Sequence, residues 1–385
     1  MNKCSRKDYI TDLPESIIDI ILTKLPIRDA VRTSILSTKW RYQWATMTRL
    51  VFKNHVPFMS DKKLAEQEIT NFIMRFLFLH QGPIYRFKLS TNCSIKSTDM
   101  DQWLLFLSRK DIKELVLMLD ANCLKIPSCI ISCQKLTTLK LQALDVKPPL
   151  RFRGFPCLKY LNLCSGSFTI EDIENLTSGC PLLEKFTFTN VGDLMGFAIH
   201  APNLKRLILN GDFSNLNLEH SPFLDVLRVD FRAEVNVLRA WESNVLMKVP
   251  VTYDRLKFID LQGINYEERN AVLYVLHLIL HSPNLQELEI GATPFESSHD
   301  KAVDLDFWGK ECPPDFTFKH LKFVEMFGLP NKSWVEFLKF VLGRSPVLEV
   351  MRVSPHVDYN EKMNMANEVL HFRRASPKVD IRFFD

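Results

Sequence analysis

Apolar residues recur along most of this chain with the spacing LxxLxL, in which other apolar residues replace leucine in some copies. The last two apolar positions of each copy alternate with polar ones, as in a strand with one buried face. Several copies follow a small residue and a proline, as in Cys180-Pro181 and Ser345-Pro346. The copies begin at Leu136, Leu158, Leu183, Leu204, Leu224, Leu256, Leu285, Leu321 and Leu348, with a weaker one at Ile112.

Periods of roughly 20–29 residues with this spacing are typical of leucine-rich repeats, in which each unit supplies one strand and one return segment. One unit cannot bury its apolar face alone, so neighbouring units stack around a shared interior. Two of the intervals here are longer, and Leu144 and Gly166 occupy positions where many such repeats carry asparagine. The pattern therefore predicts an irregular repeat solenoid, or horseshoe. An ordinary α/β domain rich in leucine remains the alternative.

The residues before the first repeat have a helical period. The segment from Leu64 to His80 carries apolar residues three and four positions apart, which predicts an amphipathic helix. A second helix is expected around Trp103. We expect the first of these helices to cap the open edge of the solenoid.

The first fifty residues predict three short helices. Asp12, Pro14 and Glu15 suit the start of the first helix, residues 27–34 form the second, and Ser37 is a good N-cap for the third. Three helices of this length offer too small a core to bury all of their apolar side chains. We expect another protein to cover part of this surface; the alternative is that the repeats cover it.

Composition and charge exclude several classes of protein. Lys and Arg number 49 against 45 Asp and Glu, and the resulting net charge of +4 is too small for a nucleic-acid-binding protein. The N-terminus lacks the apolar core of a secretory signal, and the longest uncharged apolar run, Ala271 to Leu280, is too short to span a bilayer. Nine cysteines without a CxxC pair suggest reduced thiols. We therefore expect a soluble protein of the cytoplasm or nucleus.

The residue patterns of common catalytic centres are missing. The chain has no phosphate-binding GxxxxGK[ST] loop, no GxGxxG and no GxSxG. His277 and His281 have the spacing of two zinc ligands, but Leu278 stands where a metalloprotease carries its glutamate. Two polar positions on a mostly buried helix are the simpler interpretation. We predict no catalytic residue, no metal site and no cofactor.

The N-terminal residues resemble a known family. Residues 8–18, with Asp12-Leu13-Pro14-Glu15, resemble the start of an F-box. Residues 25–37 and the following Trp40-Arg41 are similar to its continuation in plant F-box/leucine-rich-repeat proteins. Residues 318–322 and 345–349 resemble the FBD region that closes many members of this family. The resemblance spans nearly the whole chain and is most specific in the F-box.

The resemblance implies an α/β fold class with an N-terminal three-helix F-box, an irregular leucine-rich-repeat solenoid and a C-terminal FBD-like cap. The F-box is expected at residues 8–54, and linker helices with the N-terminal cap of the solenoid at residues 55–110. The repeats are expected at residues 111–317, and the FBD-like region that closes the solenoid at residues 318–385.

Members of this family are substrate-recognition subunits of SCF-type (cullin-RING) E3 ubiquitin ligases. Their F-box docks on a Skp-type adaptor, which joins them to the cullin and RING subunits, and their repeats bind the target for ubiquitination. The alternative is an interaction or scaffold protein that binds the adaptor without directing degradation. The resemblance assigns adaptor binding to Leu13, Pro14, Ile17, Ile21, Leu25, Pro26, Ala30, Val31, Leu36 and Trp40.

Strand residues between the repeat leucines point outward and form the expected recognition surface. Their charges are basic in the earlier copies and acidic in the later ones, which suggests a target with acidic groups towards the first repeats and basic groups towards the last. The alternative is a solvated surface without a partner. The candidate substrate-binding residues are Lys140, Tyr160, Lys185, Arg206, Arg228, Phe258, Asp260, Glu287, Glu289, Phe323 and Glu325. The sequence identifies neither the target protein nor a small-molecule ligand.

Overall fold

The computed structural model describes residue 10 and residues 13–54, 61–119, 124–125, 128–145, 152–194, 197–213, 216–218, 220–231, 252–266, 269–292 and 307–384. The residues expected to open the F-box before Ile10, together with Thr11 and Asp12, lie outside this described part of the chain. The chain divides into two compact units. The first unit comprises Met1–Phe168 and Gly179–Leu182, and the second comprises Thr169–Ser178 and Leu183–Asp385. Each unit is an α/β structure whose strands run parallel.

The first unit contains the N-terminal helices and a parallel sheet in the order β1, β2, β3, β5, β7. A separate short ladder joins β4 to β6. The helices are α1 (Glu15–Lys24), α2 (Ile27–Arg32), α3 (Lys62–Leu79) and α4 (Ser97–Ser108), with 3₁₀ helices at Thr33–Ile35, Gln43–Thr46 and Ser128–Ser132. The strands are β1 (Arg49–Asn54), β2 (Arg86–Thr91), β3 (Glu114–Leu119), β4 (Leu124–Lys125), β5 (Thr138–Gln142), β6 (Leu144–Asp145) and β7 (Tyr160–Cys164).

The second unit contains a parallel sheet in the order β8, β10, β12, β13, β14, β15, β16, β17, and a short ladder of β9 with β11. Its strands are β8 (Lys185–Leu194), β9 (Phe197–Ala198), β10 (Arg206–Phe213), β11 (Leu216–Asn217), β12 (Val226–Phe231), β13 (Phe258–Ile264), β14 (Glu287–Ala292), β15 (Phe323–Gly328), β16 (Val350–Pro355) and β17 (Asp380–Phe383). Its helices are α5 (Ile170–Ser178), α6 (Arg269–Leu280), α7 (Phe307–Glu311), α8 (Lys332–Arg344) and α9 (Tyr359–Leu370).

The repeated apolar pattern coincides with the strands. Each copy found in the sequence places its second and third apolar residues on one strand, and every apolar residue of these copies is at most 2% exposed. Neighbouring copies are in register, so that Leu139 lies between Leu115 and Leu161, and Leu207 lies between Phe186 and Leu227. The predicted strands with one buried face are therefore confirmed.

Two further copies of the pattern precede those predicted from the sequence. Met47, Leu50 and Phe52 lead into and form β1, and Ile84, Phe87 and Leu89 do the same for β2. All six side chains are buried. The parallel strands therefore begin before Ile112: β1 lies in the segment expected to be the F-box, and β2 lies in the segment expected to hold linker helices and the N-terminal cap.

The amphipathic helix predicted at residues 64–80 forms as α3, but its position differs from the expected edge cap. It connects β1 to β2 and packs against the sheet, with the rings of Phe72 and Phe76 at 6.0 and 5.6 Å from that of Phe52. Because β1 and β2 are parallel neighbours, the chain needs a crossover here, and an amphipathic helix supplies it.

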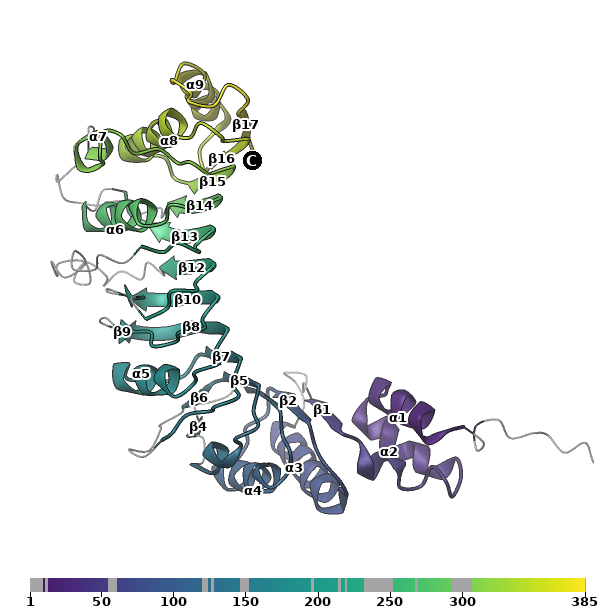
Figure 1. Ribbon diagram of the computed structural model, residues 1–385. Helices are drawn as coiled ribbons and strands as arrows, with labels where there is room; N and C mark the ends of the chain where they lie inside the picture. The colour runs from purple at the N-terminus through teal and green to yellow at the C-terminus, as the bar shows by residue number, and fades with distance from the viewer. Residues whose placement is uncertain are drawn as a thin grey trace, which may run out of the picture. The chain divides into compact units, whose positions relative to one another are not determined.

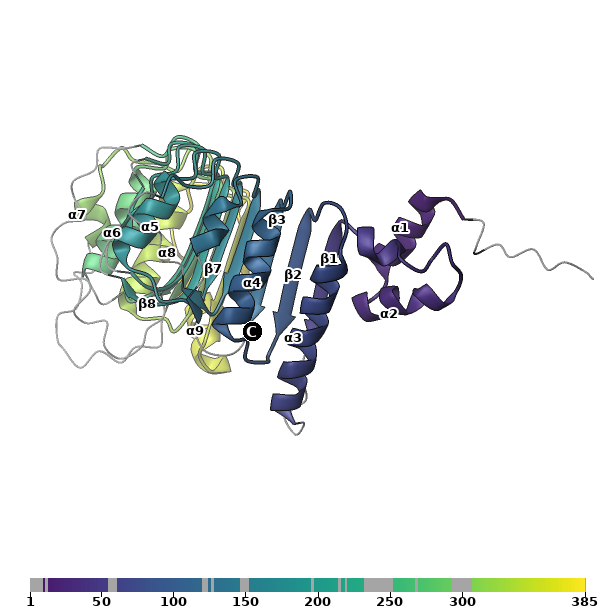
Figure 2. The same ribbon diagram turned by 90° about the horizontal axis from the view of Figure 1, so that it is seen from below.

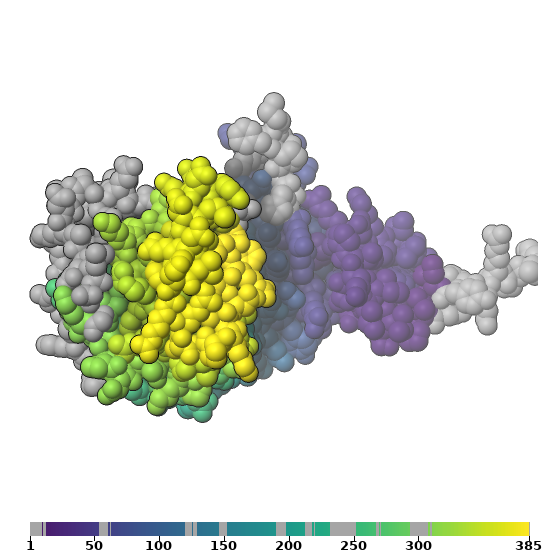
Figure 3. Space-filling view, turned by 90° about the horizontal axis from the view of Figure 1, so that it is seen from above, coloured from purple at the N-terminus to yellow at the C-terminus, as the bar shows by residue number. Residues whose placement is uncertain are grey.

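Helices α6 and α8 lie on one side of the strands in the second unit (Figures 1 and 2). Each is followed, within two residues, by a buried serine that precedes a proline. The hydroxyl of Ser282 donates to the carbonyl of Leu278 at 2.6 Å, and that of Ser345 donates to Val341 at 2.7 Å. The serine thus satisfies a carbonyl at the helix end while the proline ends the helix. The elements β16, α9 and β17 form one face of this unit, shown in yellow in Figure 3.

The third predicted helix of the N-terminal segment does not form. Turns follow Ser37, and only the 3₁₀ helix Gln43–Thr46 is present. The hydroxyl of Ser37 has no hydrogen-bond partner among the described residues, so it caps no helix. The indole N–H groups of Trp40 and Trp44 instead donate to the carbonyls of Ile10 and Arg41 at 3.1 and 3.2 Å. Burial of both tryptophans therefore determines the backbone here, in place of helix propensity.

Candidate functional site

The N-terminal module has a small core of its own. Its buried side chains are Ile18 and Leu22 of α1, Ile27 and Ala30 of α2, and Trp40 and Trp44, and α1 contacts both α2 and the 3₁₀ helix Gln43–Thr46. Only one face of α1 is needed for this core, because Ile18 and Leu22 are four residues apart and lie on the same side of the helix. The other apolar side chains of the module must therefore point elsewhere.

Large apolar side chains of this module are exposed. Ile17, Ile20 and Leu36 are 40%, 54% and 49% exposed, and Ile35 is 87% exposed. The other described elements of the first unit, which include the first repeat strands, do not cover these side chains. We call Ile17, Ile20, Ile35 and Leu36 the exposed apolar cluster. Its members come from α1 and from the turn after α2.

The structure divides the residues assigned to adaptor binding into two groups. Pro14, Ile17, Pro26 and Leu36 are exposed, and Leu13, Ile21, Leu25 and Val31 are half-buried. Ala30 and Trp40 are fully buried, so their side chains support the surface and form no part of it. Ile20 and Ile35 were not among the residues predicted from the sequence, although both are apolar residues in the same short helical segments.

The N-terminal module is joined to α3 by aromatic contacts. The ring of Trp44 lies 4.9 Å from that of Phe76, and the guanidinium of Arg28 lies 5.3 Å from the centre of Phe72. A ring nitrogen of His80 binds the carbonyl of Met47 at 2.9 Å, and burial lowers the pKa of this histidine. These contacts hold the module against α3 and the start of β1 in its own unit.

The outward-facing strand residues of the second unit form two neighbouring rows. The first row contains Lys185, Arg206, Phe258, Glu287 and Phe323 in register. We call the second, which runs across β12 to β16, the charged row; it consists of Arg228, Asp260, Glu289, Glu325 and Arg352. The structure thus brings together nine of the candidate substrate-binding residues, whereas Lys140 and Tyr160 lie in the first unit.

Arginines lie at both ends of the acidic part of the charged row. Arg228 Nε is 3.7 Å from an oxygen of Asp260, and Arg352 Nη1 is 3.6 Å from an oxygen of Glu325. Arg352 was not among the candidates predicted from the sequence, although it lies between Met351 and Val353, the same place in its repeat as Arg228. The expected separation into basic and acidic repeats therefore ends at β16, where the row becomes basic again.

Glu289 occupies the middle of the charged row and forms no ion pair with any described residue. Burial and the neighbouring carboxylates of Asp260 and Glu325 raise its pKa. Burial also raises the pKa of Asp260, against the effect of Gln262 and Arg228. A cation bound beside these two carboxylates would stabilise their charged forms.

The described residues contain no group of three or more His, Cys, Asp or Glu side chains that could hold a metal ion. The rings of His277, on α6, and of His281, directly after this helix, lie 4.0 Å apart, and burial lowers the pKa of His277. Burial raises the pKa of the Cys133 thiol to about 12 and that of Cys180 to about 11, which disfavours the reactive thiolate. Within the described part of the chain, no helix combines the length and the apolar character needed to cross a membrane.

Comparison with known families agrees with this arrangement. A model described as "F-box domain" matches residues 10–52, which cover the N-terminal module. A model described as "FBD-associated F-box protein At5g56370, LRR repeats" matches residues 100–260. F-box domains generally bind Skp-type adaptors, and neither model describes an enzyme.

Curated relatives match nearly the whole chain. The F-box/FBD/LRR-repeat protein At1g13570 of Arabidopsis thaliana is 39% identical over 414 aligned positions, which include 98% of each chain. The F-box/FBD/LRR-repeat protein At4g00160 of the same plant is 28% identical and covers 90% of this chain and 72% of its own. The identity to the first relative extends through the F-box, the repeats and the C-terminal region. This chain therefore belongs to the F-box/FBD/LRR-repeat protein family.

Proposed function

We propose that this protein is the substrate-recognition subunit of an SCF-type cullin-RING E3 ubiquitin ligase. Its F-box docks on a Skp-type adaptor, through which the cullin and RING subunits join, and its repeats bind a target protein for ubiquitination. The chemistry belongs to the ubiquitin-charged partner, so the chain needs no catalytic residue of its own. We place its action in the cytoplasm, the nucleus or both.

The exposed apolar cluster is the observation that carries this proposal. Ile17, Ile20, Ile35 and Leu36 remain accessible although the module has a filled core. Several large apolar side chains left exposed on one small module favour an interaction site, because covering them releases about 1.5–3 kcal/mol for each side chain that becomes fully buried. The match to the F-box family supports a Skp-type adaptor as the protein that covers them.

The contacts behind the cluster support a role in positioning. Trp44 and His80 hold the F-box against α3 and β1 through buried contacts. An adaptor bound to the F-box is then held in a defined orientation to the first strands of the same unit. The parallel stacking of one strand per repeat supports the predicted solenoid, with residues 318–385 as the FBD-like region that closes it.

Adaptor capture tests the proposal. The double variant Ile17→Ala/Leu36→Ala removes two exposed side chains without touching the core, and we expect it to bind the adaptor at least about tenfold more weakly. The matched control is Leu64→Ala/Phe78→Ala, which removes side chains that are 57% and 86% exposed on α3. Co-purification of the tagged chain with the adaptor and cullin gives the measurement.

The outcomes separate the two functions that the sequence leaves open. Loss of adaptor in the F-box variant, with retention in the control, supports the proposed docking surface. Equal capture by both variants contradicts it. Capture of the adaptor without cullin by the unaltered chain contradicts the ligase role and favours an interaction protein.

A further inference from the structure

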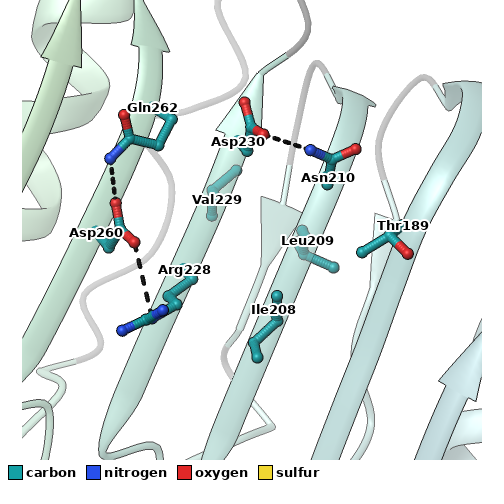
Figure 4. A pocket seen from close by; sticks show the side chains of 9 residues that line it. All are labelled: Thr189, Ile208, Leu209, Asn210, Arg228, Val229, Asp230, Asp260 and Gln262. Atoms are coloured by element: carbon teal, nitrogen blue, oxygen red, sulfur yellow. Dashed lines mark hydrogen bonds and ion pairs between the residues drawn. The ribbon is translucent and has the colours of Figure 1, made fainter.

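A pocket of about 400 Å³ opens on the outward-facing side of the second unit (Figure 4). It lies over the middle of β8, β10, β12 and β13. Three aliphatic residues form part of its wall, and the polar lining consists of Thr189, Asn210, Arg228, Asp230, Asp260 and Gln262. Its volume is in the range of small-ligand and side-chain pockets.

Strand register places the polar lining in two rows. Thr189, Asn210, Asp230 and Gln262 are successive partners across the four strands. Arg228 and Asp260 are partners two residues earlier on β12 and β13. The side chains of both rows point to the same side of the sheet, because residues i and i+2 of a strand share a face. The pocket is therefore built from regular strands and not from loops.

The side-chain donors in the pocket are largely engaged with its own carboxylates. The amide of Asn210 donates to Asp230, and that of Gln262 donates to Asp260 at 2.5 Å. The Oδ1 atom of Asn210 is buried and has no hydrogen-bond donor among the described residues. Figure 4 shows this oxygen directed away from Asp230, towards the side on which Thr189 lies. The unused capacity of the pocket therefore consists mainly of oxygen acceptors.

The charges in the pocket are not balanced. Asp230 and Asp260 face one cation, Arg228, whose Nε atom is 3.7 Å from Asp260. This distance is longer than that of a strong charge-assisted hydrogen bond. The Asp260 side chain is only 13% exposed, and Glu289 and Glu325 extend the negative charge along β14 and β15. A partly buried carboxylate with incomplete compensation favours a cationic partner.

We propose that this pocket receives a basic side chain, preferentially arginine, of the target protein. The proposal rests on the proposed function of the repeats as the target-binding surface and specifies where and how they bind. A guanidinium carries five N–H donors in a plane and no acceptor, which matches a pocket of carboxylate and amide oxygens. Lysine supplies the same charge with fewer donors, so we expect it to bind more weakly.

A peptide array tests this assignment. The full chain, purified in complex with its adaptor, is applied to arrayed random dodecapeptides. We expect the bound peptides to be enriched in arginine, and the best of them, labelled with fluorescein, to lose at least about tenfold in affinity when its arginine is replaced by citrulline. Citrulline keeps the shape of the side chain and removes its charge. An array without enrichment in basic residues, or equal affinity for the citrulline peptide, overturns the proposal.

Variants of the pocket test whether its ligand carries a positive charge. Asp230→Asn/Asp260→Asn removes both carboxylates with little change in shape and should abolish the preference for arginine. Arg228→Gln removes the competing cation and should strengthen binding of the arginine peptide. The charge-matched control Asp315→Asn/Glu349→Gln alters two exposed acidic residues outside the pocket and should leave binding unchanged.

Changes in affinity opposite to those expected contradict the proposal. Weaker binding in Arg228→Gln together with stronger binding in Asp230→Asn/Asp260→Asn shows an acidic ligand. Adaptor capture and thermal melting of each variant, measured in parallel, show that it remains folded. If adaptor capture is intact and the array shows no basic preference, this inference fails while the proposed function stands.

Discussion

At the scale of single residues, Glu289 shows that the outward-facing surface includes like charges that destabilise the fold. Asp260 and Glu325 are its register partners on the two neighbouring strands. Neighbouring strands lie about 4.8 Å apart, and like charges directly opposite each other are destabilising. Burial and these carboxylates raise the pKa of Glu289. The charged row is thus retained at some cost in stability, as is common at surfaces that bind a partner.

Glu289→Gln should therefore stabilise the protein near neutral pH. A carboxyl whose pKa is higher in the folded than in the unfolded protein binds more protons when folded, so stability falls as pH rises from its unfolded pKa through its folded pKa. The penalty is absent at lower pH, where the carboxyl is protonated in both states. We expect a gain of about 0.2–1 kcal/mol at pH 7 and none at pH 4 or below.

Thermal melting at the two pH values measures this difference. Glu349→Gln is the control, because it removes the same charge from an exposed residue that pairs with Lys322 at 3.3 Å. It should give no gain at pH 7. A melting temperature of Glu289→Gln that is unchanged or lower at pH 7 shows that the neighbouring carboxylates do not oppose one another.

At the scale of elements, the sequence predicts the strands well and their surroundings less well. The repeated apolar residues identify their strands because period-two burial leaves a clear sequence pattern. β1 and β2 are missed because Met47, Phe52 and Phe87 take the place of leucine, although the spacing is the same. The third F-box helix is predicted wrongly because burial of Trp40 and Trp44 overrides a favourable N-cap.

In the candidate surfaces too, the sequence predicts what depends on a local pattern and misses what depends on several elements. Exposed strand residues are found by alternation, yet the ion pairs of Arg228 and Arg352 depend on register, which a single repeat does not reveal. The pocket depends on four strands at once, so no local pattern indicates it. Within the F-box, the sequence identifies the apolar residues but not which of them fill the core.

Two phenylalanines on α3 test how this helix holds the first unit together. Phe76 is buried among Trp44, Phe52 and His80, whereas Phe78, two residues later, is 86% exposed. Phe76→Ala should destabilise the first unit by about 3–5 kcal/mol, because it removes a buried aromatic ring and leaves a cavity. Phe78→Ala should change stability by less than about 0.5 kcal/mol.

Chemical denaturation followed by tryptophan fluorescence distinguishes the two variants, since Trp40 and Trp44 report on the F-box. A similar loss of stability in both would mean that α3 packs with a different face from the one observed. A negligible loss in Phe76→Ala would mean that the F-box is not fixed to α3 through this ring.

At the scale of the whole molecule, the two proposed binding activities depend on different units. The exposed apolar cluster lies in the first unit, and the arginine pocket lies in the second. Each strand of a sheet pairs only with the strands beside it, as β14 does with β13 and β15. The free energy of unfolding of such an array is approximately the sum of the stabilities of the single repeats and of the interfaces between neighbours. A defect in one repeat therefore affects mainly its neighbours.

Phe337→Ala tests this independence. Phe337 is completely buried on α8, with its ring 4.5 Å from that of Trp308 and 5.9 Å from that of Tyr266. Its removal should cost about 3–5 kcal/mol and increase hydrogen exchange in α8 and in the neighbouring strands β14 to β16. Exchange in α1 to α3 and capture of the adaptor should be unchanged, because these ring partners belong to the second unit.

Leu370→Ala, on the exposed face of α9, is the control and should leave hydrogen exchange unaltered. Loss of adaptor capture together with faster exchange in α1 to α3 would show that the chain unfolds as one cooperative body, and binding at one surface would then be coupled to the stability of the other.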